Sequence, residues 1–325
     1  MQVMNDGLKQ AVMLDLKATD RGDLSLDSLY MPGLAWQLLD NAGAIQLPAL
    51  IKDKEIVVTN KVLLDRALLE QADQLKLICI CATGTNNVDL DAARERGIDV
   101  CNVTSYASAS VVQYVFAVLL NLMSRLTEHQ QAVQAGAWSS SKQFCLLDYP
   151  FKELEGKVLG IVGYGELGQA VASVAKAFGM KVMIAARNSD DKRPGRWPLA
   201  ALLPQLDVLS LHCPLTNETR HLIAKKELQA LPKGAIVINS ARGGIVDEEA
   251  LLKAIEDKHL AGAATDVLST EPPEKNHRLL QKHYPNLIIT PHIAWASTES
   301  RQRLIDQVAL NIASYLAGRP RNIVN

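Results

Sequence analysis

The stretch Lys157-Val-Leu-Gly-Ile-Val-Gly-Tyr-Gly-Glu-Leu-Gly168 decides the fold of this 325-residue chain. Residues 158–162 form a short apolar run that is typical of a strand buried on both faces. Three glycines with G-x-G-x-x-G spacing follow, and apolar residues then recur at helical spacing as far as Gly179. The pattern predicts a strand, a tight turn, a helix and a second strand.

In such a unit each glycine has a separate role in binding a dinucleotide. Gly163 permits the tight turn, Gly165 lets the backbone approach a pyrophosphate, and Gly168 lets the helix pack closely on the strand. The phosphates would face the N–H groups at the start of the helix, at Glu166 and Leu167. The alternative is a tight turn that binds no ligand.

Size and composition indicate an ordinary globular protein that is long enough for two domains. Hydrophobic residues make up 48% of the chain, charged residues 21%, and the formal net charge is −1. This balance gives no electrostatic reason to expect nucleic acid or an acidic membrane as a partner. The start of the chain lacks a signal-peptide pattern, and the apolar stretch 111–123 is too short to span a bilayer.

The cysteines and histidines lack the spacing of metal ligands. The five cysteines are an odd set, and Cys79-x-Cys81 does not have the C-x-x-C spacing of a redox or zinc site. We therefore expect reduced thiols, a cytoplasmic protein and no metal site.

Apolar runs alternate with helical patterns along the chain, which predicts parallel sheets covered by helices. The predicted fold class is α/β, with two doubly wound parallel-sheet domains. The predicted strands are 11–16, 56–59, 75–82, 99–103, 206–211, 235–239, 261–266 and 287–290, and the predicted helices are 61–72, 90–96, 222–231 and 247–257, the last with Asp247 as its N-cap.

Two further helices are predicted outside this alternation. Residues 108–134 are apolar over much more than one face, so this long helix should be buried on several sides, between domains or against another subunit. The last helix, 298–317, has no following strand and should return to cover the first domain. With the polar, aromatic-containing stretch 138–150, the long helix predicts a two-fold homodimer built on the dinucleotide-binding domain, while the other domain is free to close.

Four polar residues follow or end predicted strands, where ligands bind in open parallel sheets: Arg242, Asp266, Glu271 and His292. An arginine can hold a carboxylate and a carbonyl oxygen with paired N–H donors, and a histidine can give or take a proton. A carboxylate beside the imidazole orients it and favours its charged form. Together they predict reduction of a 2-keto acid beside a nicotinamide, although each residue alone could be structural.

A fifth candidate lies in the first domain, where residues 82–89 follow a predicted strand. Gly84, among small polar residues, could present backbone N–H groups to an anion. An ordinary loop before a capped helix is an equally good interpretation.

Five segments, in this order, closely resemble the D-isomer-specific 2-hydroxyacid dehydrogenases: 163–168, 212–216, 239–244, 266–272 and 291–295. The resemblance covers nearly the whole chain. It implies that Arg242 is the substrate-binding catalytic residue, that His292 is the acid/base and that Glu271 is the partner of His292. It implies cofactor contacts at Asp266 near the nicotinamide and also at Cys213, Pro214, Ser240 and Ala241.

The same resemblance implies a substrate-binding role for the backbone of Thr83 and Gly84, which would hold the carboxylate, and for Trp295. It implies a Rossmann dinucleotide-binding domain over 107–297, inserted in a smaller flavodoxin-like substrate domain over 1–106 that is completed by 298–325.

Within the family, residues 82–89, 110–116 and 292–297 look most like bacterial glycerate dehydrogenases, also called hydroxypyruvate reductases. This implies NAD(P)-dependent reduction of hydroxypyruvate, and of glyoxylate, to the D-2-hydroxy acid. Another small 2-keto acid reductase of the family is one alternative. A dinucleotide-sensing protein like the corepressors that share this fold is another, and the near-neutral charge disfavours it.

One position departs from family members that prefer NAD. They usually carry an acidic residue at the end of the second strand, where this chain has Ala186 followed by Arg187. Arg187 could bind the 2′-phosphate of NADP, with Asn188, Ser189, Lys192 or Arg193 nearby. Asp190 and Asp191 oppose this unless they point to solvent. We expect NADP or NAD as the cofactor, with NADPH accepted at least as well as NADH.

Overall fold

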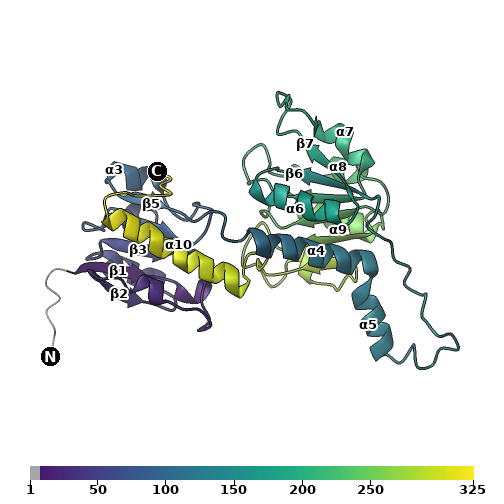
Figure 1. Cartoon of the computed structure of the whole chain (residues 1–325), viewed down its shortest axis with the longest axis horizontal. Helices are drawn as coiled ribbons and strands as arrows, with labels where there is room; N and C mark the ends of the chain where they lie inside the picture. The colour runs from purple at the N-terminus through teal and green to yellow at the C-terminus, as the bar shows by residue number, and fades with distance from the viewer. Residues whose placement is uncertain (1–7) are drawn as a thin grey trace. The chain divides into compact units, whose positions relative to one another are not determined.

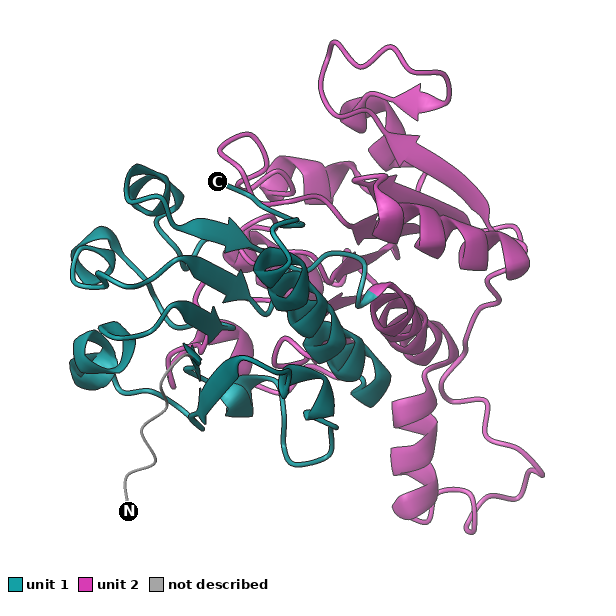
Figure 2. Ribbon diagram, turned by 60° about the vertical axis from the view of Figure 1, so that its left-hand side comes forward, with its two compact units in different colours: residues 1–107, 296–325 teal, residues 108–295 magenta. Residues whose placement is uncertain are grey.

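The computed structural model describes residues 8–325 and divides into two compact units, coloured separately in Figure 2. Unit 1 contains the described residues up to 107 together with 296–325. Unit 2 contains residues 108–295. The chain therefore passes from unit 1 into unit 2 and back again.

Unit 1 contains a five-stranded parallel sheet in the order β2-β1-β3-β4-β5. Its last helix, α10 (Thr298–Leu316), packs against β4 and is drawn in yellow in Figure 1. The other elements are β1 (Lys9–Met13), β2 (Leu34–Leu38), β3 (Ile56–Thr59), β4 (Leu77–Ile80), β5 (Asp99–Cys101), α1 (Leu47–Ile51), α2 (Arg66–Leu69) and α3 (Leu90–Glu95).

Unit 2 contains a seven-stranded sheet, also parallel throughout, in the order β12-β11-β10-β9-β6-β7-β8. Strands β7 and β8 lie on one side of β6, and the chain then crosses to β9 on the other side, which creates a switch point for ligand binding beyond β6. The strands are β6 (Val158–Val162), β7 (Lys181–Ala185), β8 (Arg196–Trp197), β9 (Val208–Leu211), β10 (Ile236–Asn239), β11 (Gly262–Thr265) and β12 (Leu287–Ile289).

These two sheets confirm the predicted α/β class. The strands of unit 2 from β9 to β11 are buried along their whole length, as expected for a parallel sheet covered on both faces. The helices of unit 2 are α4 (Ser108–Ser124), α5 (Leu126–Gln134), α6 (Glu166–Ala177), α7 (Leu199–Leu202), α8 (Lys225–Ala230) and α9 (Glu248–Glu256). Asp247 caps α9 by accepting a hydrogen bond from the N–H of Ala250.

The prediction of one helix over 108–134 was wrong. Arg125 adopts a left-handed conformation, with φ of 53°, and separates α4 from α5 by a bend of 59°. The Asn121 side chain accepts hydrogen bonds from the N–H and the hydroxyl of Thr127. At the break, the N–H of Thr127 therefore bonds to a side chain instead of to a helical carbonyl group. Within residues 8–325, no single helix meets the length and hydropathy expected of a membrane span, although α4 and α5 taken together do.

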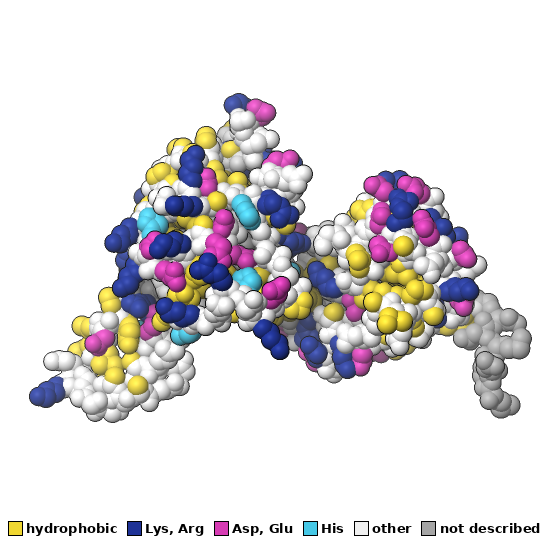
Figure 3. All heavy atoms as spheres, turned by 180° about the vertical axis from the view of Figure 1, so that it is seen from behind, with side chains coloured by type: hydrophobic (Ala, Val, Ile, Leu, Met, Phe, Trp, Pro, Cys, Tyr) yellow, Lys and Arg dark blue, Asp and Glu magenta, His cyan; other side chains and the backbone are white. Residues whose placement is uncertain are grey.

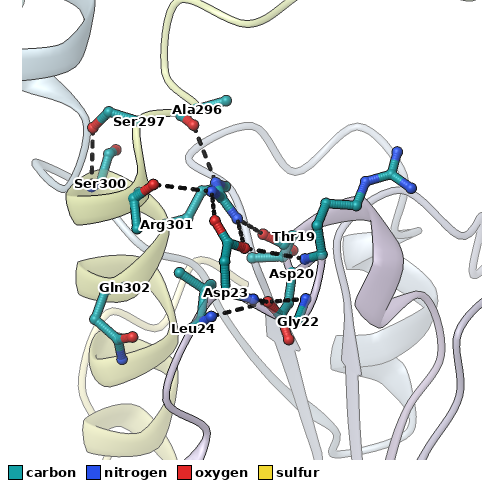
Figure 4. Close-up of polar contacts among 12 residues, drawn as sticks. Thr19, Asp20, Gly22, Asp23, Leu24, Ala296, Ser297, Ser300, Arg301 and Gln302 are labelled. Carbon is teal, nitrogen blue, oxygen red and sulfur yellow. Dashed lines mark hydrogen bonds and ion pairs between the residues drawn. The ribbon is translucent and has the colours of Figure 1, made fainter.

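An arginine at the start of α10 fastens this helix to the N-terminal part of unit 1 (Figure 4). Arg301 donates from Nη1 to the carbonyl of Thr19 at 3.1 Å, from Nε to the carbonyl of Ala296 at 3.1 Å, and with both terminal nitrogens to the carboxylate of Asp23. The guanidinium holds the pKa of Asp23 well below its usual range. Ala296, the first residue of the returning chain, is thereby fixed on unit 1.

Each unit brings together the two places where the chain enters and leaves it. In unit 2, Ser110 Oγ donates a hydrogen bond to the carbonyl of Ala294 at 2.7 Å. In unit 1, the carbonyl of Tyr106 accepts hydrogen bonds from Arg303 Nε at 2.9 Å and from Ser300 Oγ at 3.2 Å.

Candidate active site

The glycine loop between β6 and α6 is shaped by close backbone contacts. A Cβ atom at Gly163, where φ is +89°, would lie 2.5 Å from the backbone N of Cys213, and one at Gly168 would lie 2.2 Å from the carbonyl oxygen of Gly163. A Cβ at Gly165 would meet nothing within 4 Å. Gly163 and Gly168 are therefore required by packing, whereas Gly165 faces open space.

That open space lies at the N-terminus of α6, where Gly165 is the N-cap and provides no side-chain hydrogen bond. The N–H groups at Glu166 and Leu167 begin this helix, so an anion placed there would meet N–H donors and the positive end of the helix dipole. The Glu166 carboxylate accepts a hydrogen bond from the Ser108 hydroxyl. The loop thus fits a pyrophosphate.

Further along this edge of the sheet, the loop after β10 presents Arg242. The Asn239 side chain accepts from the N–H of Ala241 at 3.1 Å and donates to the carbonyl of Arg242 at 3.0 Å. The exposed Arg242 side chain donates from Nη1 to the carbonyl of Ala241 at 2.7 Å. The Ser240 hydroxyl is buried without a hydrogen-bond partner among residues 8–325, so a ligand could supply one.

His292 and Glu271 form a hydrogen-bonded pair. His292 Nδ1 lies 2.7 Å from Glu271 Oε2, and the other oxygen of Glu271 accepts from the N–H of Leu268 at 2.9 Å. Because a carboxylate only accepts, the imidazole donates from Nδ1, which leaves Nε2 for a substrate. The two side chains are 29% and 36% exposed, so the pair is accessible from solution.

The loop that carries His292 is held from beneath by Asp266. This residue is 1% exposed, and its carboxylate accepts from the N–H of Ile293 at 2.8 Å, the N–H of Ala294 at 2.7 Å and the hydroxyl of Thr290. Burial raises the pKa of Asp266, while these donors oppose the shift. The Asp266 carboxylate therefore organises the loop, and its place near the nicotinamide stays a prediction.

Backbone contacts complete this loop. His292 has φ of 54°, and its N–H donates to the carbonyl of Asp266 at 2.8 Å. Trp295 Nε1 donates to the carbonyl of His292 at 2.9 Å. Trp295 therefore braces the segment that presents the imidazole.

The end of β7 differs from the sequence-based expectation in the position of Asp191. We allowed this carboxylate to point to solvent, but its side chain is only 5% exposed. It accepts from the N–H of Arg187 at 2.9 Å and from Arg193 Nε and Nη2, each at 2.7 Å. Its charge is thus balanced inside the loop, whereas the Arg187 side chain is exposed.

Sequence reasoning missed a second arginine near this strand end. Arg196 lies in β8 beside Ile184 of β7, and its guanidinium is 4.6 Å from the centre of the Tyr164 ring in the glycine loop. Its Nε and Nη1 atoms are buried, with no hydrogen-bond partner in the described part of the chain. A partly buried guanidinium whose Nε and Nη1 lack acceptors favours a nearby anion.

Cys213 and Pro214 follow β9 in unit 2, and two further candidates belong to unit 1. Thr83 and Gly84 follow β4, and the Thr83 hydroxyl donates to the carbonyl of Val103 at 2.9 Å. Asn102 Nδ2 donates to the carbonyl of Thr83 at 2.7 Å. In the part of the chain that the structure describes, no three His, Cys, Asp or Glu residues are grouped so that they could hold a metal ion.

A glycine loop at the switch point of a parallel sheet, with an arginine and a histidine–glutamate pair along the same edge, is typical of dehydrogenases that use a nicotinamide dinucleotide. The family model of the D-isomer-specific 2-hydroxyacid dehydrogenase, NAD-binding domain, matches residues 116–294. The chain belongs to the D-isomer-specific 2-hydroxyacid dehydrogenase family. It is an oxidoreductase that acts on CH–OH groups with NAD or NADP.

Individual relatives agree with this family. The chain is 42% identical over 274 residues to the glycerate dehydrogenase of Methylorubrum extorquens, covering 84% of this chain and 86% of the relative. It is 38% identical over 320 residues to the hydroxypyruvate reductase of Blautia hydrogenotrophica, covering 97% and 99%. The structure of an NADPH-dependent glyoxylate/hydroxypyruvate reductase from Sinorhizobium meliloti, with NADP and malonate, superimposes with a TM-score of 0.80 at 25% identity and covers 97% of this chain and 96% of that one.

Proposed function

We propose that this protein reduces hydroxypyruvate, and also glyoxylate, to the corresponding D-2-hydroxy acid. The observation that carries the proposal is the 2.7 Å contact between His292 and Glu271 on the sheet edge that also presents Arg242. The names of the two relatives, which cover most of this chain, support the choice of substrate. The reaction consumes the keto acid, one reduced coenzyme and one proton.

The residues divide this chemistry among them. The bound coenzyme supplies a hydride to the carbonyl carbon. Arg242 holds the carboxylate and the carbonyl oxygen, and charged His292 donates its Nε2 proton to that oxygen. Glu271 stabilises the imidazolium before the transfer. We propose unit 1 as the substrate domain, in which backbone N–H groups at Thr83 and Gly84 can hold a carboxylate.

The test measures the loss of absorbance at 340 nm with hydroxypyruvate, glyoxylate and pyruvate as substrates, each with NADPH and with NADH. We expect hydroxypyruvate to give the highest kcat/KM. Turnover of a different 2-keto acid alone would favour another reductase of the family. Coenzyme binding without turnover of any acid would favour the dinucleotide-sensing alternative.

We further propose that NADPH is used at least as well as NADH. Ala186 leaves no carboxylate to repel a 2′-phosphate, Asp191 is neutralised by Arg193, and the exposed Arg187 side chain follows the strand end. The partly buried guanidinium of Arg196 adds positive charge near the same strand end.

The ratio of kcat/KM for NADPH to that for NADH tests this preference. Arg187→Ala should lower the ratio by roughly tenfold, because one charge-assisted contact to the phosphate is lost. Lys181→Ala removes an exposed cation at the opposite end of β7 and should leave the ratio unchanged. A wild-type preference for NADH of more than tenfold would contradict the proposal.

We also propose a homodimer formed by unit 2. Large apolar side chains are exposed along the extended segment after α5, including Trp138 at 52%, Phe144 at 91% and Leu147 at 82%. Figure 3 shows hydrophobic side chains on this projecting part of unit 2. A groove of about 660 Å³, lined by residues such as Met123 and Phe151, adjoins it and can receive the segment of a second copy.

We place the enzyme in the cytoplasm. All five cysteines, which lie among the described residues, are free thiols, and this supports a reducing compartment. The formal net charge of −1 supports neither nucleic acid nor an acidic membrane as a partner.

A further inference from the structure

The backbone of Leu268 and Ser269 supports the side chain of Glu271. The N–H of Leu268 donates to Glu271 Oε1 at 2.9 Å, and Glu271 Oε2 in turn lies 2.7 Å from His292. The following peptide, between Leu268 and Ser269, touches the backbone of Gly243, where a Cβ atom would lie 1.8 Å from the Leu268 oxygen. Contact with the Gly243 backbone thus prevents this peptide from moving toward the loop that carries Arg242.

A single carboxylate holds this peptide in place. Glu248 is the first residue of α9, and its Oε1 accepts from the N–H of Ser269 at 2.7 Å. Its Oε2 accepts from the Ser269 hydroxyl at 3.2 Å and lies 3.0 Å from His277 Nε2. Ser269 precedes Glu271 and His277 follows it. Glu248 therefore holds the loop that contains Glu271 in place at both of its ends.

The surroundings make this tie effective. The side chains of Glu248 and His277 are 19% and 17% exposed, so their contacts are largely shielded from water. Leu252, one turn further along α9, packs with Leu268 and Leu279 in a small buried cluster. Only an ionised carboxylate can accept from all three donors, because the amide of a glutamine has one oxygen and would direct N–H groups at a donor.

We propose that Glu248 is a positioning residue of the active site, which fixes Glu271, and through it His292, by way of the backbone of Leu268 and Ser269. This inference rests on the proposed acid/base role of the His292–Glu271 pair. It adds a residue outside that pair, on which the orientation of the imidazole depends.

The test compares Glu248→Ala with a matched control on the same helix. Glu248→Ala should lower kcat for hydroxypyruvate roughly 10- to 100-fold, since small displacements of catalytic groups have effects of this size, while the Kd for NADPH stays within about twofold. Glu249→Ala removes an exposed ion pair between α9 and Arg278 of the same loop, and should leave kcat unchanged. Equal losses in both variants, or a parallel loss of coenzyme binding, would overturn the inference.

A double-mutant cycle shows whether Glu248 acts through Glu271. In the Glu271→Gln background, Glu248→Ala should change kcat by less than about twofold, because the group that it positions is already removed. Losses that multiply would mean that Glu248 acts elsewhere and would overturn the proposal.

A third measurement does not depend on turnover. The amide hydrogens of Leu268 and Ser269 should exchange faster in Glu248→Ala, or in Glu248→Gln if the alanine variant does not fold, than in Glu249→Ala. Unchanged exchange overturns the positioning role. Faster exchange in a protein that reduces no 2-keto acid would instead show that the proposed function is wrong and that the positioning role of Glu248 is correct.

Discussion

The imidazole of His292 is the group on which the proposed proton transfer depends. Its Nδ1 is engaged by Glu271 at 2.7 Å, so Nε2 is the atom that can reach a carbonyl oxygen. We predict that His292→Ala lowers kcat by about 10² to 10⁴, because a general acid contributes a factor of this size, while coenzyme still binds. Steady-state kinetics and a fluorescence titration with NADPH measure both quantities, and near-normal turnover would contradict the assignment.

Glu271 should control the pH range of the reaction. Keto-acid reduction needs a protonated imidazole, and the carboxylate beside it stabilises that charged form. In Glu271→Gln this stabilisation is lost, so activity should fail first on the alkaline side and the basic limb of the pH–rate profile should move to lower pH. A basic limb that stays in place would rule out this role.

His212, at the end of β9, should make stability depend on pH. Burial lowers the pKa of His212 to about 4 from its usual value of 6.5, so the unfolded chain takes up a proton at a higher pH than the folded chain. Stability is therefore fully present above about pH 6.5 and declines as the pH falls toward 4, by on the order of 3 kcal/mol. Urea unfolding at pH 7.5 and pH 5 should show a smaller decline in His212→Asn, and equal declines would contradict the prediction.

Among the helices and strands, those with strong local signals were predicted well. The unit formed by β6, α6 and β7 follows from three glycines and one apolar face, all within 30 residues. Strand β2 was missed because its five residues are only half-buried, at the edge of the sheet, and do not form a clear apolar run. The break at Arg125 was missed because the hydrogen bonds of Asn121 to Thr127 compete with a helix that the apolar pattern alone favours.

The candidate site likewise contains residues with a local sequence signal and contacts that depend on packing. Arg242 and His292 could be selected because each stands just after a strand, and Glu271 because it follows Asp266 in the loop after another strand, since the sheet brings strand ends to one edge. The contact of Glu248 with Ser269 joins residues 21 positions apart and depends on how α9 packs, which no local pattern reveals. The ion pair of Asp191 with Arg193 depends in turn on the fold of its loop.

For the whole molecule, the exposed apolar segment of unit 2 predicts the state of assembly. Wild-type protein at micromolar concentration should sediment at twice the chain mass of 35.5 kDa, because burial of these side chains favours association. The double variant Phe144→Asp and Leu147→Asp should shift the protein to the monomer. Ile45→Asp is the control, since Ile45 is 97% exposed but lies in unit 1, and it should not change the mass. A monomeric wild type would contradict the proposal.

The hydrogen bond between Ser110 and Ala294 has a consequence for how such a protein can be taken apart and rebuilt. Because both ends of residues 108–295 meet, this segment is a cassette that can be exchanged as one piece, and its ends can be joined by a short peptide. Tyr106 and Ser300 are likewise within a hydrogen bond of each other, so the flanking halves can be joined directly when the cassette is removed. Closing the chain at these two points would give two small proteins, one from residues 108–295 and one from the flanking residues. A related cassette with a different coenzyme preference could replace residues 108–295 without redesign of the flanking residues.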